Sequence, residues 1–178
     1  KEAVDNALDA CEEARILPEI NVEIIQLSDT RFRVIVEDNG PGIIKKQIPK
    51  IFAKLLYGSK FHKLSATRGQ QGIGISAAVL YGQLPTGKPA TITSKIGRGK
   101  PGNRIKLKIN TQTNNPQTME DKEVEWEEKD HGTKIEIDMD GSYIKGRQSV
   151  DEYLKETAIV NPHCTIIYTN PEANQIIF

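Results

Sequence analysis

Residues 68–74 read Arg68-Gly69-Gln70-Gln71-Gly72-Ile73-Gly74, and the apolar segment 75–80 that follows them predicts a helix. Glycines at a helix entry leave several backbone N–H groups free at its N-terminus, where the helix dipole also favours anions. The stretch therefore predicts a phosphate-binding turn, with a turn that needs glycine for a positive φ as the alternative. It is neither a P-loop nor a dinucleotide-binding fingerprint, because no Gly-Lys-Ser/Thr follows and a long polar segment, not a strand, precedes it.

A second cluster of turn residues, Asp38-Asn39-Gly40-Pro41-Gly42, lies upstream and ends the alternating segment 31–38, which predicts a strand. A bare Asp-Asn-Gly is most often a simple turn. An aspartate at a strand end also accepts hydrogen bonds from amino groups, and the exocyclic amine of adenine is one such donor. The glycines leave room for a flat base beside the backbone.

The N-terminal segment 1–14 predicts a helix in which Glu2, Asn6 and Asp9, spaced by four and three, share one face beside the apolar stripe. Asn6 and Asp9 are poor helix formers in mid-helix positions, so they indicate a role other than helix stability. Mg²⁺ prefers oxygen ligands and keeps several waters, so Asn6 could supply a neutral oxygen to a metal that also holds phosphates. Glu2 could orient or deprotonate an attacking water.

The remaining pattern predicts an α+β fold, a two-layer sandwich of a mixed, mostly antiparallel sheet with helices on one face. We expect a single domain over 1–178, with 160–178 leading out of it. Segment 57–72 is a long polar loop, and such loops are usually functional or mobile. Further helices are predicted over 45–56 and 149–158, a loop over 111–121, and strands over 21–28, 90–94, 104–109, 123–128, 133–139, 165–169 and 175–178.

The order of these motifs resembles the GHKL ATPases, a superfamily of gyrase, MutL repair proteins, heat-shock chaperones and sensor histidine kinases. The resemblance is carried by Glu2-Ala3-Val4-Asp5-Asn6-Ala7-Leu8-Asp9-Ala10, by the clusters at 38–42 and 68–74, and by Gly132-Thr133. It implies the Bergerat ATP-binding fold. Within the superfamily the chain is most similar to the B-subunit family of topoisomerase VI, a type IIB DNA topoisomerase, through Leu55-Leu56-Tyr57-Gly58-Ser59-Lys60-Phe61, the run 68–78 and the segment 11–18.

The resemblance implies a role for each matching residue. Glu2 would be the general base that activates water, and Asn6 the Mg²⁺ ligand. Asp38 would bind the adenine amine, supported by Thr133 through a water molecule, with Gly40 and Gly42 shaping the base pocket. Ser59 and Lys60 would belong to an ATP lid. The phosphates would be wrapped by Gly69, Gln70, Gln71, Gly72, Ile73, Gly74, Ile75 and Ser76.

The implied function is the ATPase module of a type IIB topoisomerase, with ATP and Mg²⁺ as cofactors. ATP binding would close a self-dimer around DNA, and the cutting tyrosine would lie on the A subunit of topoisomerase VI, in an assembly of two A and two B subunits. Two alternatives stay open: a phosphotransferase like the histidine kinases, against which Glu2 argues, and a non-catalytic ATP-gated clamp or chaperone. The chain also departs from the family pattern at Ala3, where a larger apolar residue is usual.

Both ends predict a piece of a longer protein, because the chain starts without Met inside a helical pattern and ends in Ile176-Ile177-Phe178. We expect the N-terminal strap, the helical DNA-facing domain and the transducer domain to be missing. The transducer supplies a lysine to the terminal phosphate in this family. The 178-residue chain should therefore bind nucleotide better than it hydrolyses it.

Composition argues against non-specific nucleic-acid binding by the whole surface, because 24 Lys and Arg balance 24 Asp and Glu. A small basic patch remains, which consists of Lys100, Arg104, Lys106 and Lys108. A solvated face is its default interpretation, with a DNA or partner contact as the alternative.

The two cysteines, Cys11 and Cys164, predict buried reduced thiols. No apolar run is long enough to cross a membrane and the sequence shows no signal-peptide pattern, so we expect a cytoplasmic protein without a membrane partner.

Overall fold

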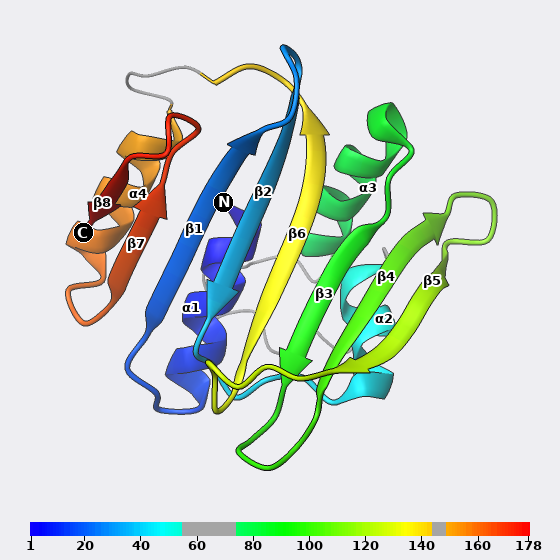
Figure 1. Ribbon diagram of the computed structural model, residues 1–178, viewed down its shortest axis with the longest axis horizontal. Helices are drawn as coiled ribbons and strands as arrows, with labels where there is room; N and C mark the ends of the chain where they lie inside the picture. Colours follow the sequence, from blue (N-terminus) through cyan, green and yellow to red (C-terminus); the bar gives the residue numbers. More distant parts are fainter. Residues whose placement is uncertain (55–73, 144–148) are drawn as a thin grey trace.

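An eight-stranded sheet with helices on one face forms the part of the chain that the computed structural model describes, residues 1–54, 74–143 and 149–178 (Figure 1). The strands are β1 (Glu19–Gln26), β2 (Arg31–Asp38), β3 (Ala90–Lys95), β4 (Gly102–Asn110), β5 (Asn115–Val124), β6 (Gly132–Asp140), β7 (Thr165–Thr169) and β8 (Gln175–Ile177). Their order is β5-β4-β3-β6-β2-β1-β7-β8. Only β1 and β7 pair in parallel among these neighbours. The predicted mixed, mostly antiparallel α+β fold is confirmed.

The helices are α1 (Glu2–Glu13), α2 (Ile48–Phe52), α3 (Gly74–Thr86) and α4 (Val150–Val160), and a 3₁₀ turn, η1 (Lys45–Gln47), leads into α2. All four α-helices lie behind the sheet in Figure 1. Ser149 caps α4, because its Oγ accepts a hydrogen bond from the Glu152 N–H at 3.2 Å. None of the helices in these described ranges is long and apolar enough to cross a membrane.

The core lies between the sheet and the helices, and the period-two alternation of the strands builds it. In β1, Ile20, Val22 and Ile24 face the helices and are at most 6 % exposed. From the other side, α1 contributes Val4 and Leu8 at helical spacing. Burying a large aliphatic side chain contributes roughly 1.5–3 kcal/mol to the stability of the folded state. This layer therefore fixes both the register of the strands and the face that α1 turns toward the sheet.

Strand β5 is the largest error of the sequence prediction, which placed a loop over 111–121 and a strand over 123–128. β5 is an edge strand with no buried residue, so hydrophobic alternation gives no signal for it. Pairing with β4 holds it in place instead. Trp126, assigned to the predicted strand, lies beyond β5 and is 9 % exposed.

Two helices also differ from their predicted bounds. α3 continues past residue 80 to Thr86, because Pro85 lies in the last turn, where it costs a single backbone hydrogen bond. The helix predicted over 45–56 is divided into η1 and α2, and α2 ends at Phe52, because Ala53 leaves the helical conformation with φ −130°. The strands predicted over 31–38 and 165–169 have the predicted bounds.

Candidate functional site

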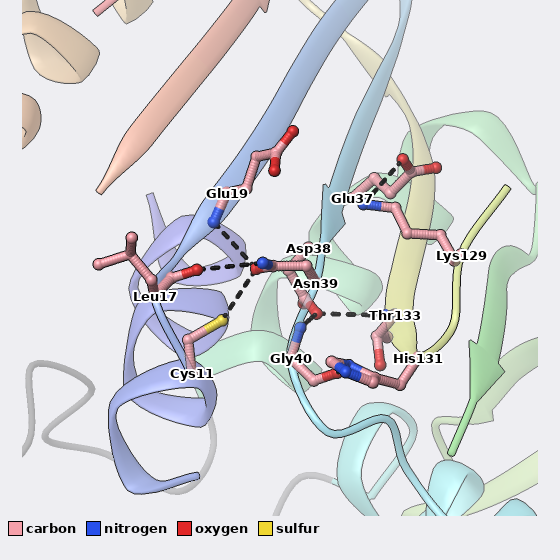
Figure 2. A network of polar contacts seen from close by, with 10 residues as sticks. All are labelled: Cys11, Leu17, Glu19, Glu37, Asp38, Asn39, Gly40, Lys129, His131 and Thr133. Carbon is pink, nitrogen blue, oxygen red and sulfur yellow. Dashed lines mark hydrogen bonds and ion pairs between the residues drawn. The ribbon is translucent and has the colours of Figure 1, made fainter. Parts of the chain in front are cut away.

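A buried network of polar residues lies where one end of β2 meets β6 and β3 (part of it is shown in Figure 2). Asp38 lies opposite Thr133 in the β2–β6 pairing, and Thr133 lies opposite Ser94 in the β3–β6 pairing. The Asp38 Oδ1 atom accepts hydrogen bonds from the N–H of Gly40 at 2.8 Å and from the N–H of Thr133 at 3.2 Å. The structure thus brings together Asp38, Gly40 and Thr133, three of the predicted site residues.

Burial raises the pKa of the Asp38 carboxyl to about 6, from an ordinary value of 3.8. The N–H groups of Gly40 and Thr133 and the charge of Lys129 act in the opposite direction, whereas Glu37 raises the pKa further. The carboxylate is therefore mostly ionised at pH 7. Among the described residues both backbone hydrogen bonds go to Oδ1, which leaves Oδ2 to accept a hydrogen from another donor, such as an amino group.

Ser94 is a second hub of this network, and the sequence prediction missed it. Its side chain is fully buried, and its Oγ contacts three polar atoms. The Ile43 N–H donates to it at 2.8 Å, the Gly132 carbonyl oxygen lies at 3.1 Å and the Thr133 Oγ1 lies at 2.9 Å. Ser94 therefore connects the loop after Asp38 to the start of β6.

Two glycines, Gly40 and Gly42, determine the conformation of the loop that follows Asp38. Gly42 has φ +76°, and a Cβ at this position would collide with the backbone carbonyl oxygen of Lys95, so only glycine fits. The Gly40 carbonyl oxygen lies 2.7 Å from Nδ1 of His131, which donates when the proton is on Nδ1. His131 thus has a structural role at the site.

Asn39 joins this loop to the segment that follows α1, a role that the Asp-Asn-Gly pattern alone did not reveal. Its Oδ1 accepts from the Glu19 N–H at 2.9 Å and from the Cys11 thiol at 3.5 Å, and its Nδ2 donates to the Leu17 carbonyl at 3.0 Å (Figure 2). Burial raises the pKa of Cys11 to about 12, so the thiol keeps its proton. Asn39 therefore fixes the position of β2 relative to the C-terminal end of α1.

The N-terminal half of α1 carries Glu2 and Asn6, both partly exposed. Glu2 lies against the first turn of α3, because a Cβ on Gly74 would collide with the Glu2 carboxylate. The structure therefore brings two further predicted residues, Glu2 and Gly74, into close approach. Within the described residues, none of the hydrogen bonds of Asp38 involves α1, so these two groups of predicted residues are not joined directly.

A partly buried hydrogen bond from α4 supports α1. Asp5, which is 8 % exposed, accepts a hydrogen bond from the Tyr153 hydroxyl of α4 at 3.0 Å. Burial raises the pKa of Tyr153, so this hydroxyl remains a donor. Asp5 lies one residue before Asn6, and α4 thereby helps to position the helix that carries the predicted metal ligand.

The predicted phosphate-binding stretch is described only from Gly74 onward. Ile75 is a core residue, 2 % exposed. Ser76 is fully buried, and its hydroxyl lies 2.9 Å from the Ile51 carbonyl and 3.1 Å from the Lys54 carbonyl, so its side chain attaches α3 to α2. The other predicted residues lie outside the described ranges: Ser59, Lys60, Gly69, Gln70, Gln71, Gly72 and Ile73.

The described residues contain no group of three or more His, Cys, Asp or Glu side chains that could hold a metal ion by themselves. A Mg²⁺ that keeps most of its waters and binds phosphate oxygens needs only one or two protein ligands. The single amide oxygen of Asn6, partly exposed on α1, fits such a site.

Residues 1–140 match the family model described as Histidine kinase-, DNA gyrase B-, and HSP90-like ATPase. The chain belongs to this ATPase family. The matched range contains α1, the Asp38 network and the start of α3, and it ends at the last residue of β6.

Curated relatives are similar over the whole chain. It is 56 % identical over 179 residues to the B subunit of type 2 DNA topoisomerase 6 from Methanococcoides burtonii, covering 100 % of this chain and 29 % of the relative. It is 59 % identical over 179 residues to the protein of the same name from Methanosarcina barkeri, with the same coverage. The chain thus spans less than a third of the length of these relatives. The resemblance to the B-subunit family of topoisomerase VI is confirmed.

Two solved structures share the fold at low sequence identity. The ATP-binding domain of topoisomerase IV from Francisella tularensis has a TM-score of 0.56 and 15 % identity, covering 99 % of this chain and 82 % of that one. The N-terminal domain of a DNA repair protein has a TM-score of 0.51 and 10 % identity, covering 99 % and 51 %. These likenesses support the Bergerat architecture.

Proposed function

We propose that this chain binds and hydrolyses ATP as a module of a type IIB DNA topoisomerase, equivalent to part of the B subunit of topoisomerase VI. The observation that carries the proposal is the buried Asp38 carboxylate. Its Oδ1 is held by two backbone N–H groups, while Oδ2 receives no hydrogen bond from the part of the chain that the structure describes. The family match and the high identity to B subunits of topoisomerase VI support it.

In this proposal Asp38 accepts a hydrogen bond from the adenine amine, and Thr133 supports the base beside it. Gly40 and Gly42 would shape the base pocket by allowing the loop after Asp38 to pack closely, since a Cβ on Gly42 would collide with the Lys95 backbone. The fixed bonds to Oδ1 favour binding, because the acceptor does not have to reorganise when the base arrives.

Asn6 and Glu2 are proposed to act at the phosphate end of the nucleotide. Mg²⁺, held by the Asn6 oxygen together with phosphate oxygens and water, would neutralise phosphate charge. Glu2 would take a proton from the attacking water. Its approach to Gly74 supports this role, because the N-terminus of α3 favours anions such as phosphate.

The chain spans 29 % of the relatives' length, and we propose the following activity for the whole protein. ATP binding would close a dimer of two such modules around DNA, and a separate A subunit would cut the DNA in an assembly of two A and two B subunits. We propose the cytoplasm as its location. A histidine-kinase-like phosphotransferase and a non-catalytic clamp are the competing functions, and phosphate release that depends on Glu2 would separate hydrolysis from both.

Calorimetric titration of this chain with a non-hydrolysable ATP analogue, with and without Mg²⁺, tests the proposal. Asp38→Asn keeps an oxygen for the two backbone bonds and replaces the other oxygen with an NH₂ group, so the fold should persist. Two donors then face each other, and we expect roughly 10- to 100-fold weaker binding. Asn6→Ala should lose only the Mg²⁺ dependence.

Asp140→Asn is the matched control, because Asp140 lies on the same sheet but pairs with Arg31 at 2.7 Å, away from Asp38. It should bind like the wild type. Failure of the folded wild type to bind the analogue would disprove the proposed function. Unchanged binding by Asp38→Asn would instead disprove the assignment of Asp38 alone.

A further inference from the structure

The hydroxyl of Ser94 makes three short polar contacts, and together they determine where its hydrogen points. The Ile43 N–H carries a hydrogen and must donate to Ser94 Oγ, at 2.8 Å. The Gly132 carbonyl oxygen carries none and can only accept, at 3.1 Å. The third contact, to Thr133 Oγ1 at 2.9 Å, joins two hydroxyls, and either could donate.

Counting hydrogens resolves the ambiguity. Ser94 has one hydroxyl hydrogen and two lone pairs. If that hydrogen pointed to Thr133, the contact with the Gly132 carbonyl would bring two oxygens together with no hydrogen between them. The assignment that places a hydrogen in every contact has Ser94 donating to Gly132 and accepting from Ile43 and from Thr133. The Thr133 hydroxyl hydrogen is therefore committed to Ser94.

A Thr133 hydroxyl that donates to Ser94 offers only lone pairs to anything else. Thr133 lies directly opposite Asp38 in the β2–β6 pairing, and the Asp38 carboxylate also offers only lone pairs. We propose that Ser94 is a specificity-determining residue that keeps Thr133 an acceptor, so that the site selects a base with an amino group over one with a carbonyl. This inference rests on the proposed nucleotide binding by Asp38 and Thr133, and it has the Thr133 hydroxyl face the base directly rather than through a water molecule.

The chemistry of purines makes the distinction sharp. Adenine carries an amino group at C6, a donor that matches acceptors. Hypoxanthine and guanine carry a carbonyl oxygen at the same position, which would face the acceptors of Asp38 and Thr133. Without Ser94 the Thr133 hydroxyl could rotate and donate to that carbonyl, which would remove part of the penalty.

The test is the ratio of affinities for ADP and IDP, measured by calorimetry on this chain at one Mg²⁺ concentration. Ser94→Ala leaves the Ile43 N–H and the Gly132 carbonyl without their partner, so weaker binding of both nucleotides is expected. The ratio removes this shared loss. We expect the preference for ADP over IDP to fall roughly three- to tenfold, the equivalent of one hydrogen bond.

Thr133→Val provides the second arm, because it removes the hydroxyl that Ser94 is proposed to orient. Its ADP preference should also fall, and adding Ser94→Ala to it should change the ratio no further. An unchanged ratio in Ser94→Ala, or an equal fall in the Thr133→Val background, would overturn the inference. If the wild type binds neither nucleotide, the proposed function itself is wrong.

A folding check by circular dichroism accompanies each variant. If Ser94→Ala does not fold, Ser94→Cys replaces it, since a thiol is a weaker donor and acceptor of similar shape. Its ratio should then lie between those of the wild type and Thr133→Val. A wild-type ratio in a folded Ser94→Cys variant that has lost affinity for both nucleotides would also overturn the inference.

Discussion

Two carboxylates of the sheet, Asp38 on β2 and Glu120 on β5, each lie among polar groups, yet their surroundings differ. Asp38 is 8 % exposed and is held by backbone N–H groups, which cannot move away. Glu120 has a side chain 30 % exposed and lies 3.4–3.8 Å from the charged ends of Arg104, Lys106 and Lys122. The first arrangement leaves one oxygen open to a ligand, whereas the second neutralises its carboxylate with long, adaptable cations.

The two pKa shifts have opposite signs for this reason. Burial raises the pKa of Asp38 to about 6, and two backbone hydrogen bonds only partly offset it. Desolvation also raises the pKa of Glu120, but Lys106, Lys122 and Arg104 together outweigh it and leave the pKa below its ordinary value. A buried carboxylate supported by the backbone thus marks a site, whereas a partly exposed one among cations is neutralised by them.

The same comparison bears on the basic patch of Lys100, Arg104, Lys106 and Lys108. Two of its members, Arg104 and Lys106, lie close to Glu120 on the adjacent strand. Their charge is therefore partly balanced within the sheet. This favours the solvated-face interpretation over a nucleic-acid contact.

The largest loss of stability is expected from a substitution at Gly42, because this residue packs closely against the Lys95 backbone. Gly42→Ala forces a side chain into φ +76° and onto the Lys95 carbonyl, and should lower the free energy of unfolding by about 3–5 kcal/mol. Gly99→Ala is the matched control, because Gly99 has φ +78° but nothing within 4 Å of a Cβ. It should cost about 1–2 kcal/mol. Urea unfolding measures both, and equal losses would show that the loop can yield.

A pH-dependent effect of intermediate size is expected from Asp38. Its folded pKa, about 6, exceeds its ordinary 3.8, so its contribution to stability is fully present below 3.8 and is lost as pH rises through 6. The free energy of unfolding of the wild type should therefore fall relative to Asp38→Asn between pH 4 and pH 7, by about 2 kcal/mol. Denaturant unfolding of both proteins at four pH values in this range measures the difference. A constant difference would mean that Asp38 is not desolvated.

The smallest effect is expected at Glu120. Glu120→Gln removes a charge among three cations on an exposed strand, so it should lower the melting temperature only slightly at low salt. The change should disappear at high salt, because salt screens exposed charges. Thermal unfolding at two salt concentrations tests this. A large fall in the melting temperature that does not depend on salt would contradict this prediction and would show that Glu120 is shielded from solvent, as Asp38 is.

Much of the Asp38 site was predictable because its residues are close in sequence to strong local signals. Asp38 and Gly42 belong to one turn cluster at a strand end, and Gly132-Thr133 opens a clear alternating strand. Ser94 was missed because its role depends on the register of β3 against β6, which no local pattern encodes. A signal did exist, since Ser94 continues the buried alternation of Ala90 and Ile92 and is the only polar residue of the three.

Long-range contacts and exposed edges account for the other failures. Asp5 looks like one more polar helix residue until α4, near the other end of the chain, places Tyr153 against it. β5 has no apolar face to reveal it, and pairing with β4 creates it. Sequence patterns report local periodicity and burial, so elements that exist only through a distant partner are not visible to them.

The parallel pairing of β1 with β7 has a consequence for how this chain folds during synthesis. Glu19–Gln26 emerges first, and its partner Thr165–Thr169 emerges only after about 140 further residues, which takes roughly 7–30 seconds at translation rates. Until then β1 is an open sheet edge, and α1 lacks the hydrogen bond from Tyr153 to Asp5. A protein cut at residue 140, where the family match ends, would keep that edge exposed permanently, so expression of the shorter piece should favour aggregation.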